Sequence, residues 1–126
     1  MSLQLCAMTN DLEGLKKCLK GGQGINDKDE NGNAALHQCS MYGAIDVLEY
    51  LISNGADVNV LDDANRTPLI NGIAAADHFK VTQLLLEAGA DPNIKDEYGD
   101  TALSEAQMRN KEDTVDLLIR NGAKAE

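Results

Sequence analysis

Apolar residues recur at helical spacing along the chain, and the pattern they form is itself repeated. The clearest copy spans residues 43–59, where Ile45, Leu48, Leu51 and Ile52 mark one face of an amphipathic helix. Further copies, weaker at the two ends of the chain, occupy residues 11–26, 78–93 and 111–126. Each copy predicts a helix of about the same length.

Each copy closes on a glycine, which ends a helix well because it adopts the left-handed conformation without strain. These glycines lie 33, 34 and 33 residues apart, at Gly22, Gly55, Gly89 and Gly122. A period near 33 with two helical patterns per unit is typical of stacked repeats. We therefore predict an all-α solenoid of helix–turn–helix units in a single domain over residues 1–126. The expected units are an N-terminal cap at 1–28, two central units at 29–61 and 62–95, and a C-terminal cap at 96–126.

Local signals set the expected helix boundaries in the first two units. Leu3, Cys6 and Ala7 form the inward side of a short helix. Asp11 is a good N-cap for a second helix, which stops at the glycine pair that follows. In the second unit we expect a short first helix over residues 35–42.

The third unit carries both a clear start signal and an irregularity. Thr67 as cap and Pro68 at the first helical position open its first helix. Gly72 falls inside that helix, where glycine costs about 1 kcal/mol relative to alanine. The alanine run 74–76 holds one residue more than the second unit, so we expect a distorted or lengthened turn there. In the fourth unit the last helix is expected over 112–120.

Four short motifs resemble the ankyrin repeat. Residues 51–59 read LISNGADVN, residues 85–93 read LLEAGADPN, residues 67–69 read TPL, and residues 36–37 read LH. The resemblance covers nearly the whole chain. It implies an L-shaped stack, in which β-turn fingers join the units, the first helices form a concave face, and the second helices form an outer layer.

The chain departs from this family at the Thr-Pro-Leu-His element. The family resemblance implies that a threonine hydroxyl and a histidine ring bond together and tie units to one another. No unit here has both residues: His37 has no such threonine, Thr67 meets Ile70, and Thr101 meets Ser104. We therefore expect modest stability.

The resemblance also implies a contact surface for a protein partner, made of finger tips and the concave helix face. The implied finger positions are Lys28, Glu30, Asn31, Asn33, Leu61, Asp63, Ala64, Arg66, Lys95, Glu97, Tyr98 and Asp100. The implied concave positions are Met41, Tyr42, Ala74, Ala75, Met108 and Arg109. Tyr42 and Tyr98 are the expected anchors because aromatic residues dominate binding hot spots. Leu61 is expected to be an exposed apolar contact. The alternative for each position is a partly buried residue that packs on the next unit.

The composition limits the possible partners mainly through its net charge. The 126 residues contain 21 acids and 11 bases, for a net charge of −10. Binding to nucleic acid or an anionic membrane requires a basic face, so neither is expected. The acidic surface indicates either a basic protein partner or a solvated surface that keeps a monomer soluble. Aromatic residues make up only 3%, as suits a repeat stack filled by aliphatic side chains.

The cysteine count and the hydropathy pattern bear on location. Cys6 and Cys39 lie 33 residues apart, at equivalent positions of successive units. Packed helices are about 8–10 Å apart, which exceeds the Cα separation of about 7 Å that a disulfide allows. With Cys18, they are expected to be core thiols in a reducing compartment, cytoplasmic or nuclear. We expect no secretory signal and no membrane-spanning helix.

The sequence holds one partial metal motif. Residues 27–32 read DKDENG and match the first half of a calcium loop, but position 12 is Gln38 instead of a bidentate glutamate. His37 and His78 have no ligand partner at metal spacing; His37 is expected to be a hydrogen-bonded structural residue, and His78 to begin a second helix. We expect no metal site and no cofactor.

No nucleophile or phosphate-binding motif is present in the sequence. The paired carboxylates Asp62-Asp63 and Asp96-Glu97 fall on predicted exposed fingers, whereas general acid catalysis needs a buried carboxyl group with a raised pKa. We interpret them as a solvated acidic face, and we do not expect an enzyme.

The sequence favours a non-enzymatic protein–protein interaction module, a small intracellular adaptor or inhibitor. The alternative is a ligand- or metal-binding regulator that uses the acidic fingers, with Asp27 and Asp29 nearest the ligand. The family resemblance further implies that Asn59 and Asn93 are candidate substrates of a 2-oxoglutarate-dependent hydroxylase.

Overall fold

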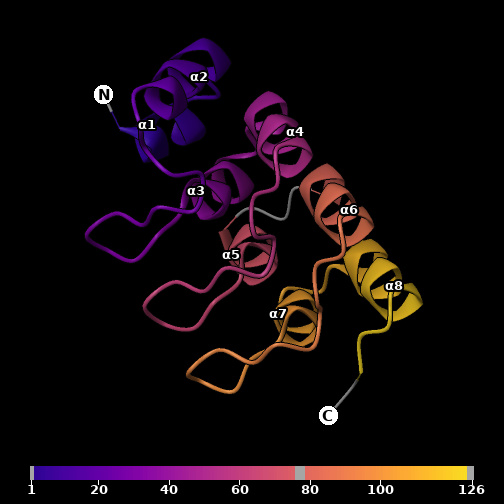
Figure 1. Ribbon diagram of the computed structural model, residues 1–126. Coiled ribbons are helices and arrows are strands. Elements are labelled where there is room, and N and C mark those ends of the chain that lie inside the picture. Colours follow the sequence, from indigo (N-terminus) through magenta and orange to yellow (C-terminus); the bar gives the residue numbers. More distant parts are fainter. Residues whose placement is uncertain (1, 76–78, 125–126) are drawn as a thin grey trace.

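A computed structural model describes residues 2–75 and 79–124 of the chain. Within these ranges the chain forms eight helices and no strand (Figure 1). The helices are α1 (Leu3–Met8), α2 (Leu12–Lys20), α3 (Ala35–Tyr42), α4 (Ile45–Ser53), α5 (Pro68–Ala75), α6 (Phe79–Glu87), α7 (Ala102–Met108) and α8 (Glu112–Arg120). The predicted all-α solenoid is confirmed.

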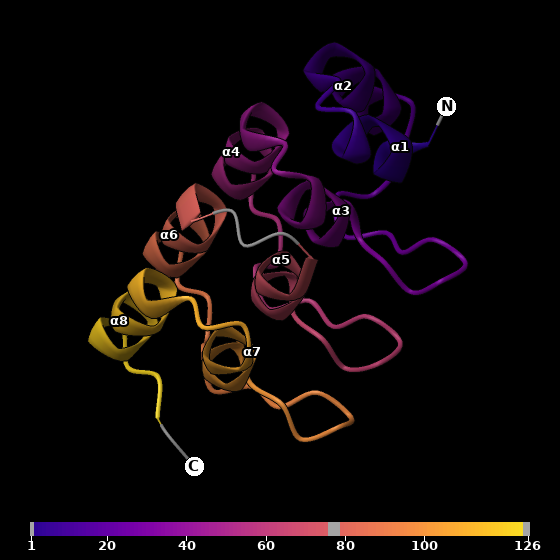
Figure 2. The same cartoon turned by 180° about the vertical axis from the view of Figure 1, so that it is seen from behind.

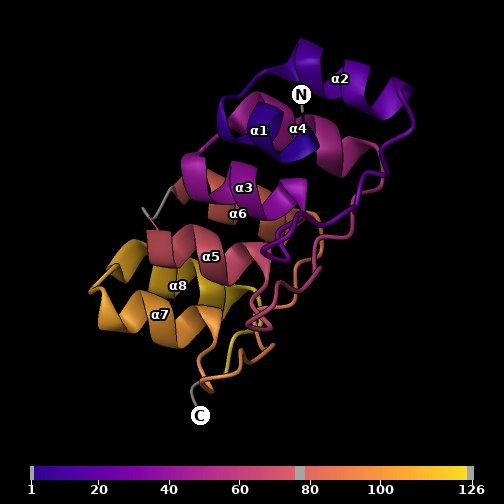
Figure 3. The ribbon, with the colours of Figure 1, turned by 90° about the vertical axis from the view of Figure 1, so that its left-hand side faces the viewer.

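The helices lie in two layers. The odd-numbered helices α1, α3, α5 and α7 pack side by side, and the even-numbered helices form a second layer behind them (Figures 1 and 3). Three long loops, before α3, α5 and α7, project beyond the first layer on the side away from the second (Figure 2). We call the first layer the inner layer, the second the outer layer, and the three loops the fingers. This arrangement matches the expected L shape.

Equivalent positions of successive units build the core as continuous rows. In the inner layer Leu3, Leu36, Leu69 and Leu103 are at most 2% exposed. In the outer layer the buried row is Cys18, Leu51, Leu85 and Leu118, each four residues before a closing glycine. A fully buried aliphatic side chain contributes about 1.5–3 kcal/mol. Each unit therefore gains its stability from the neighbours that cover its row.

The predicted helix starts are confirmed by their capping bonds. The Asp11 carboxylate accepts a hydrogen bond from the Gly14 backbone N–H at 2.9 Å. The Thr67 hydroxyl accepts one from the Ile70 backbone N–H at 3.2 Å. These caps satisfy N–H groups that the first helical turn leaves unpaired, which explains why the chain turns into a helix at those residues.

Gly72 is unfavourable for helix formation but has a role in helix packing. Helix α5 runs through it without interruption, and a Cβ added there would lie 3.3 Å from the carbonyl oxygen of Ser40 in α3. The missing side chain therefore lets α5 approach α3 closely. The lengthened turn predicted at residues 74–76 and the helix start predicted at His78 involve residues 76–78, which lie outside the described residues.

The three cysteines are buried thiols that form no disulfide. Cys6 lies next to Cys18 across the first helix pair, and burial together with this neighbour raises the pKa of the Cys6 thiol. Burial also raises the pKa of the Cys39 thiol. Their interpretation as small core residues is confirmed. None of the helices formed by the described residues has the length and apolar character needed to cross a bilayer.

Candidate functional site

Each finger is built around one aspartate: Asp29, Asp62 or Asp96. Its Oδ1 accepts hydrogen bonds from the backbone N–H groups two and four residues later, at 2.9–3.0 Å. The backbone N–H of the same aspartate donates to the carbonyl four residues later. The fourth residue of each turn has a positive φ, at Gly32, Asn65 and Gly99. An aspartate followed three residues later by glycine or asparagine is therefore the local signature of a finger.

The paired carboxylates of the fingers differ in exposure. Asp62 is half-buried and Asp96 is only 6% exposed, because each carboxylate faces back into its own turn. Asp63 and Glu97, which follow them, are exposed. The prediction of solvated pairs is therefore wrong for Asp62 and Asp96 and confirmed for Asp63 and Glu97.

One exposed carboxylate stands at the same place on each finger. Glu30, Asp63 and Glu97 each follow the turn-forming aspartate directly, and all three are exposed. Tyr98 on the third finger is 71% exposed. We call these three acids the carboxylate row; together with Tyr98 they give the finger tips an acidic surface with one large aromatic contact.

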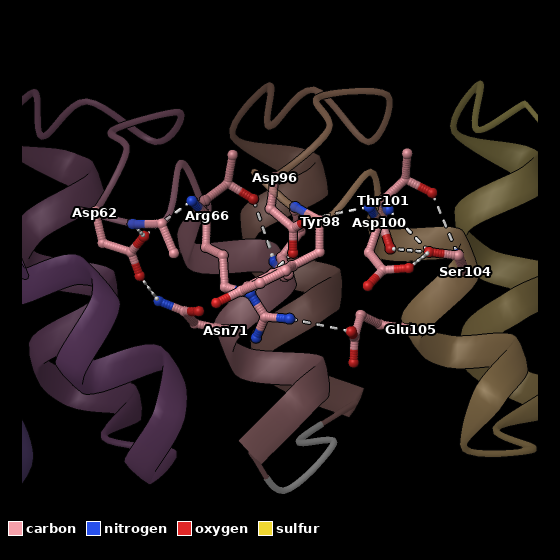
Figure 4. Close-up of polar contacts among 12 residues, drawn as sticks. Asp62, Arg66, Asn71, Asp96, Tyr98, Asp100, Thr101, Ser104 and Glu105 are labelled. Atoms are coloured by element: carbon pink, nitrogen blue, oxygen red, sulfur yellow. Dashed lines mark hydrogen bonds and ion pairs between the residues drawn. The ribbon is translucent and has the colours of Figure 1, made fainter.

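Asp62 is held ionised by its contacts. Its Oδ2 accepts a hydrogen bond from the Asn71 side chain of α5 at 3.0 Å (Figure 4). Partial burial opposes ionisation, but the hydrogen bonds from Asn71 and from the backbone N–H groups of Arg66 and Ala64 outweigh it and lower the pKa of Asp62. The bond also fastens the second finger to the helix that follows it.

Arg66 joins the second finger to the third finger and to α7. Its Nε donates to the Asp96 carboxylate at 2.9 Å, and its Nη2 donates to the Glu105 carboxylate at 3.2 Å (Figure 4). The acidic side chains are 0% and 5% exposed. Arg109 contacts the other Glu105 oxygen at 3.4 Å. A guanidinium suits this place because its planar fork can donate to two carboxylates at once.

This network changes the expected role of Arg66. Sequence reasoning placed Arg66 among the partner contacts, but its side chain is 23% exposed and occupied by two buried acids. Glu105 is absent from the contacts predicted from the sequence. Its only local signal is the spacing of four residues to Arg109, and the 39 residues that separate it from Arg66 hide the main contact.

His37 connects two units without the help of a threonine. The ring is fully buried. Nδ1 accepts from the Ala34 backbone N–H at 3.0 Å, and Nε2 donates to the Arg66 carbonyl in the next finger at 2.9 Å. The predicted structural role of His37 is confirmed, and one ring both caps its own helix and ties it to the following unit.

The fingers also touch one another. The Glu97 backbone N–H donates to the Ala64 carbonyl at 2.9 Å. Gly32 lies so close to the second finger that an added Cβ would meet the Asp63 carboxylate and stand 2.8 Å from the Asp63 backbone nitrogen. A Cβ added at Gly99, which has nearly the same φ, would have no atom of the described residues within 4 Å apart from its chain neighbours.

These two glycines form a matched pair for a stability test. Alanine costs about 1–2 kcal/mol at either position because both have a left-handed backbone. Gly32→Ala additionally pushes the first finger against the second, so we expect it to cost at least about 1 kcal/mol more than Gly99→Ala. Urea unfolding of the two variants measures the difference. Equal costs would show that the first two fingers do not pack as described.

The predicted contact residues fall into two exposure groups. Exposed residues are Lys28, Glu30, Asn31, Tyr42, Asp63, Ala75, Lys95, Glu97, Tyr98, Met108 and Arg109. Half-buried residues are Asn33, Met41, Leu61, Ala64, Arg66, Ala74 and Asp100. The prediction that Leu61 is exposed is therefore wrong. Asp100 is engaged where its finger meets α7, because its carboxylate accepts from the Ser104 hydroxyl of that helix at 3.3 Å.

The exposed positions form two separate rows. The finger tips precede the inner helices, whereas Tyr42 and Met108 lie at the C-terminal ends of α3 and α7. The helix residues between the two rows are buried, at positions 35–40 of α3 and 68–73 of α5. An eight-residue helix is about 12 Å long, so a partner that contacts both rows must extend along the inner layer.

Closing asparagines link successive units in the same way. Asn26, Asn59 and Asn93 each accept a backbone N–H from the following unit through Oδ1, at 2.8–2.9 Å. The predicted modification concerns Asn59 and Asn93, whose side-chain oxygens are engaged in these bonds. Whether they are hydroxylated stays a prediction, which intact-mass measurement after incubation with a hydroxylase would test.

The acidic loop at residues 27–32 uses its carboxylates internally. Asp27 accepts from the Gly24 backbone N–H at 2.7 Å, and Asp29 forms its finger turn. Over residues 2–75 and 79–124, no group of three or more histidine, cysteine, aspartate or glutamate side chains is placed to hold a metal ion. A ligand at Asp27 or Asp29 would have to displace these backbone bonds.

Comparison with known proteins gives a consistent result. The sequence model described as "Ankyrin repeats (3 copies)" matches residues 3–96. An "Ankyrin repeat-containing protein P16F5.05c" of Schizosaccharomyces pombe is 35% identical over 107 residues, which cover 83% of this chain and 70% of that protein.

Other relatives are much longer than this chain. "Ankyrin repeat and KH domain-containing protein mask-1" of Caenorhabditis elegans is 42% identical over 90 residues, covering 71% of this chain and 3% of that protein. "E3 ubiquitin-protein ligase Ufd4" of Drosophila melanogaster is 32% identical over 105 residues, covering 82% of this chain and 4% of that protein. The chain therefore corresponds to a small segment of each.

Proposed function

The chain belongs to the ankyrin repeat family, and from this premise we propose that it is a non-enzymatic binding module, a small adaptor or inhibitor. Ankyrin repeats generally serve as protein–protein interaction modules. We propose residues 1–126 as one binding domain that acts as a monomer. We also propose a cytoplasmic or nuclear location, which is supported by three buried thiols outside any disulfide.

The observation that carries the proposal is the carboxylate row. Glu30, Asp63 and Glu97 repeat once per finger and are exposed, while the aspartate before each of them is committed to its own turn. Because the fingers are held in register by Arg66 and by their mutual contacts, the row is presented as a fixed array. We propose that it binds a segment of a partner that carries several lysine or arginine side chains.

Tyr98 adds an apolar anchor to this array. Tyr98 is 71% exposed, and its backbone N–H donates to the carboxylate of the buried Asp96. The side chain is therefore presented from a constrained loop, which lowers the entropy lost on binding. Tyr42 and Met108 form the second row at the helix ends, where a longer partner would make additional contacts.

Affinity capture from native lysate tests this surface. The finger variant carries Glu30→Gln, Asp63→Asn, Glu97→Gln and Tyr98→Ala. A matched control carries Glu49→Gln, Glu87→Gln and Asp116→Asn, which removes the same number of exposed acids from the outer layer. We expect wild type and the control to retain the same partner protein. The finger variant should retain at least about tenfold less of that protein, since truncation of an aromatic anchor alone costs about 2 kcal/mol of binding free energy.

Circular dichroism must first show equal helix content in all three proteins. The retained protein is then purified, and its affinity is measured at two salt concentrations, because a charge-based contact weakens as salt increases. Equal retention by the finger variant and wild type would remove the fingers as the binding surface. Loss with the outer-layer control alone would move the interface to the other side of the molecule.

A further inference from the structure

Helix α2 is basic in a chain that is strongly acidic. Its nine residues include Lys16, Lys17 and Lys20 and a single acid, Glu13. The whole chain carries a net charge of −10. The helix lies in the outer layer, at a distance from the fingers (Figures 1 and 2). Its charge therefore belongs to a different surface from the carboxylate row.

The lysines line a groove between α2 and α4. The groove has a volume of about 500 Å³, and its lining consists of Glu13, Lys16, Lys17, Leu19, Lys20 and Tyr50. Leu19 and Tyr50 are half-buried and pack against the core, so they supply an apolar floor. The ammonium group of Lys16 lies over the Tyr50 ring, 5.3 Å from its centre, so this lysine is held against the floor of the groove.

The lysine contacts leave positive charge available. Lys16 approaches Glu13 at 3.8 Å, but both side chains are substantially exposed, and such a pair contributes little. Lys17 and Lys20 are exposed. The groove thus combines the exposed side chains of Lys17 and Lys20 with an aromatic and an aliphatic side chain beneath them.

The next groove along the outer layer has the same position in the repeat but a different charge. The positive charge is therefore a property of the α2 sequence and not of the repeat architecture. The groove between α4 and α6 is about 260 Å³ and is lined by Glu49, Ile52, Ser53, Leu84, Glu87 and Ala88. It occupies the equivalent place one unit further on, has a similar apolar floor, and carries two acids instead of three lysines. Ligands for the two grooves must therefore differ in charge.

We infer that the groove between α2 and α4 is a binding site for a short acidic peptide segment, in which glutamate or aspartate residues flank an apolar side chain. The carboxylates would pair with Lys16, Lys17 and Lys20, and the apolar side chain would pack on Leu19 beside the Lys16–Tyr50 contact. A short segment fits because it touches only the basic groove. A long polyanion such as a nucleic acid would also meet the acidic surfaces that surround it, which repel it.

The inference is independent of the proposed function, since it concerns other residues on another layer. The test is a titration of ¹⁵N-labelled protein with the peptide acetyl-EELFED-amide, followed by amide NMR signals. The uncharged peptide acetyl-QQLFQN-amide is the matched ligand control. We expect the acidic peptide alone to shift the signals of α2 and of the Tyr50 region of α4, and we expect added salt to weaken its binding.

Two double variants complete the test. Lys17→Gln with Lys20→Gln removes two groove charges, and Lys80→Gln with Lys124→Gln removes two exposed lysines elsewhere. Loss of two surface charge pairs weakens binding on the order of fivefold, so we expect that change for the groove variant and wild-type affinity for the control. Before titration, the amide NMR spectra of both variants must match that of wild type away from the substituted residues.

Several results would overturn the inference. They are no shifts at millimolar peptide, shifts confined to other helices, equal binding of the uncharged peptide, or wild-type affinity in the groove variant. Tighter binding of a single-stranded oligonucleotide than of the acidic peptide would replace the peptide by a nucleic acid as the ligand. The capture experiment with the finger variant tests a different surface, because none of its four substitutions lies in the groove between α2 and α4.

Discussion

Replacing Arg66 with methionine will lower the free energy of unfolding by about 3–5 kcal/mol. Arg66 is the cation that pairs with the buried Asp96 carboxylate and, together with Arg109, with the buried Glu105 carboxylate. Removing one partner of a buried ion pair costs this much because the remaining charge is left without compensation. Methionine keeps most of the side-chain volume, so lost packing adds little. Urea unfolding followed by circular dichroism measures the change.

Arg109→Met is the matched control for this substitution. Arg109 contacts the same Glu105 carboxylate at 3.4 Å, but its side chain is 45% exposed. Solvent screens such a pair, so we expect a cost below about 1 kcal/mol. Adding Asp96→Asn and Glu105→Gln to Arg66→Met removes the stranded charges and should recover part of the lost stability. Equal costs for Arg66→Met and Arg109→Met would contradict the buried network.

The network matters for binding because it reaches the finger tips. Asp96, which Arg66 holds, accepts the backbone N–H of Tyr98 and so fixes the loop that presents this ring. Loss of the guanidinium therefore weakens both the joint between two fingers and the orientation of the expected aromatic anchor. Stability and partner binding are expected to fall together in Arg66→Met.

Substituting His37 with alanine is expected to cost about 3–4 kcal/mol. The ring is fully buried, and its loss leaves the Ala34 N–H and the Arg66 carbonyl without their partner and opens a cavity. Each unsatisfied buried polar group costs about 1–3 kcal/mol, and the cavity adds to that. The midpoint of urea unfolding is the measurement. A cost below about 1 kcal/mol would show that the units are held together without this link.

His37 also predicts how stability depends on pH. Burial lowers the pKa of His37, and this effect outweighs the opposing hydrogen bond to Arg66 and the charge of Asp62. The folded state therefore keeps a neutral ring at pH values where the unfolded chain, with a histidine pKa of about 6.5, already binds a proton. The contribution of His37 is complete above that value. It is lost as the pH falls below it, by at most about 1.4 kcal/mol per pH unit.

A non-titrating variant isolates this contribution from the many acids of the chain. His37→Gln is compared with wild type by urea unfolding at pH 7.5 and pH 5. The stability advantage of wild type should shrink at the lower pH, because only wild type pays to keep the ring neutral. An advantage that is unchanged between the two pH values would show that the His37 ring is protonated in the folded state as readily as in the unfolded chain.

The helices and their order follow from local patterns in the sequence. Apolar spacing, capping residues and closing glycines act within about four residues, so they can be read without knowledge of the fold. The helix predicted over 35–42, the start at Thr67 and Pro68, and the last helix over 112–120 all agree with the structure. The repeat period then predicted a stack of equivalent units that cover one another's apolar rows. The resemblance to the ankyrin repeat implied the two layers and the fingers.

The roles of the polar residues of the fingers depend on how the units stack. A carboxylate preceding another acid looks the same in the sequence whether it faces water, as Glu97 does, or lies beneath a guanidinium, as Asp96 does. Arg66 and Glu105, 39 residues apart, meet only when the third unit stacks on the fourth. Burial depends on which neighbours arrive from other units, and that information lies outside any local window. The same reason explains why Arg66 and Leu61, predicted as partner contacts, are partly enclosed within the stack.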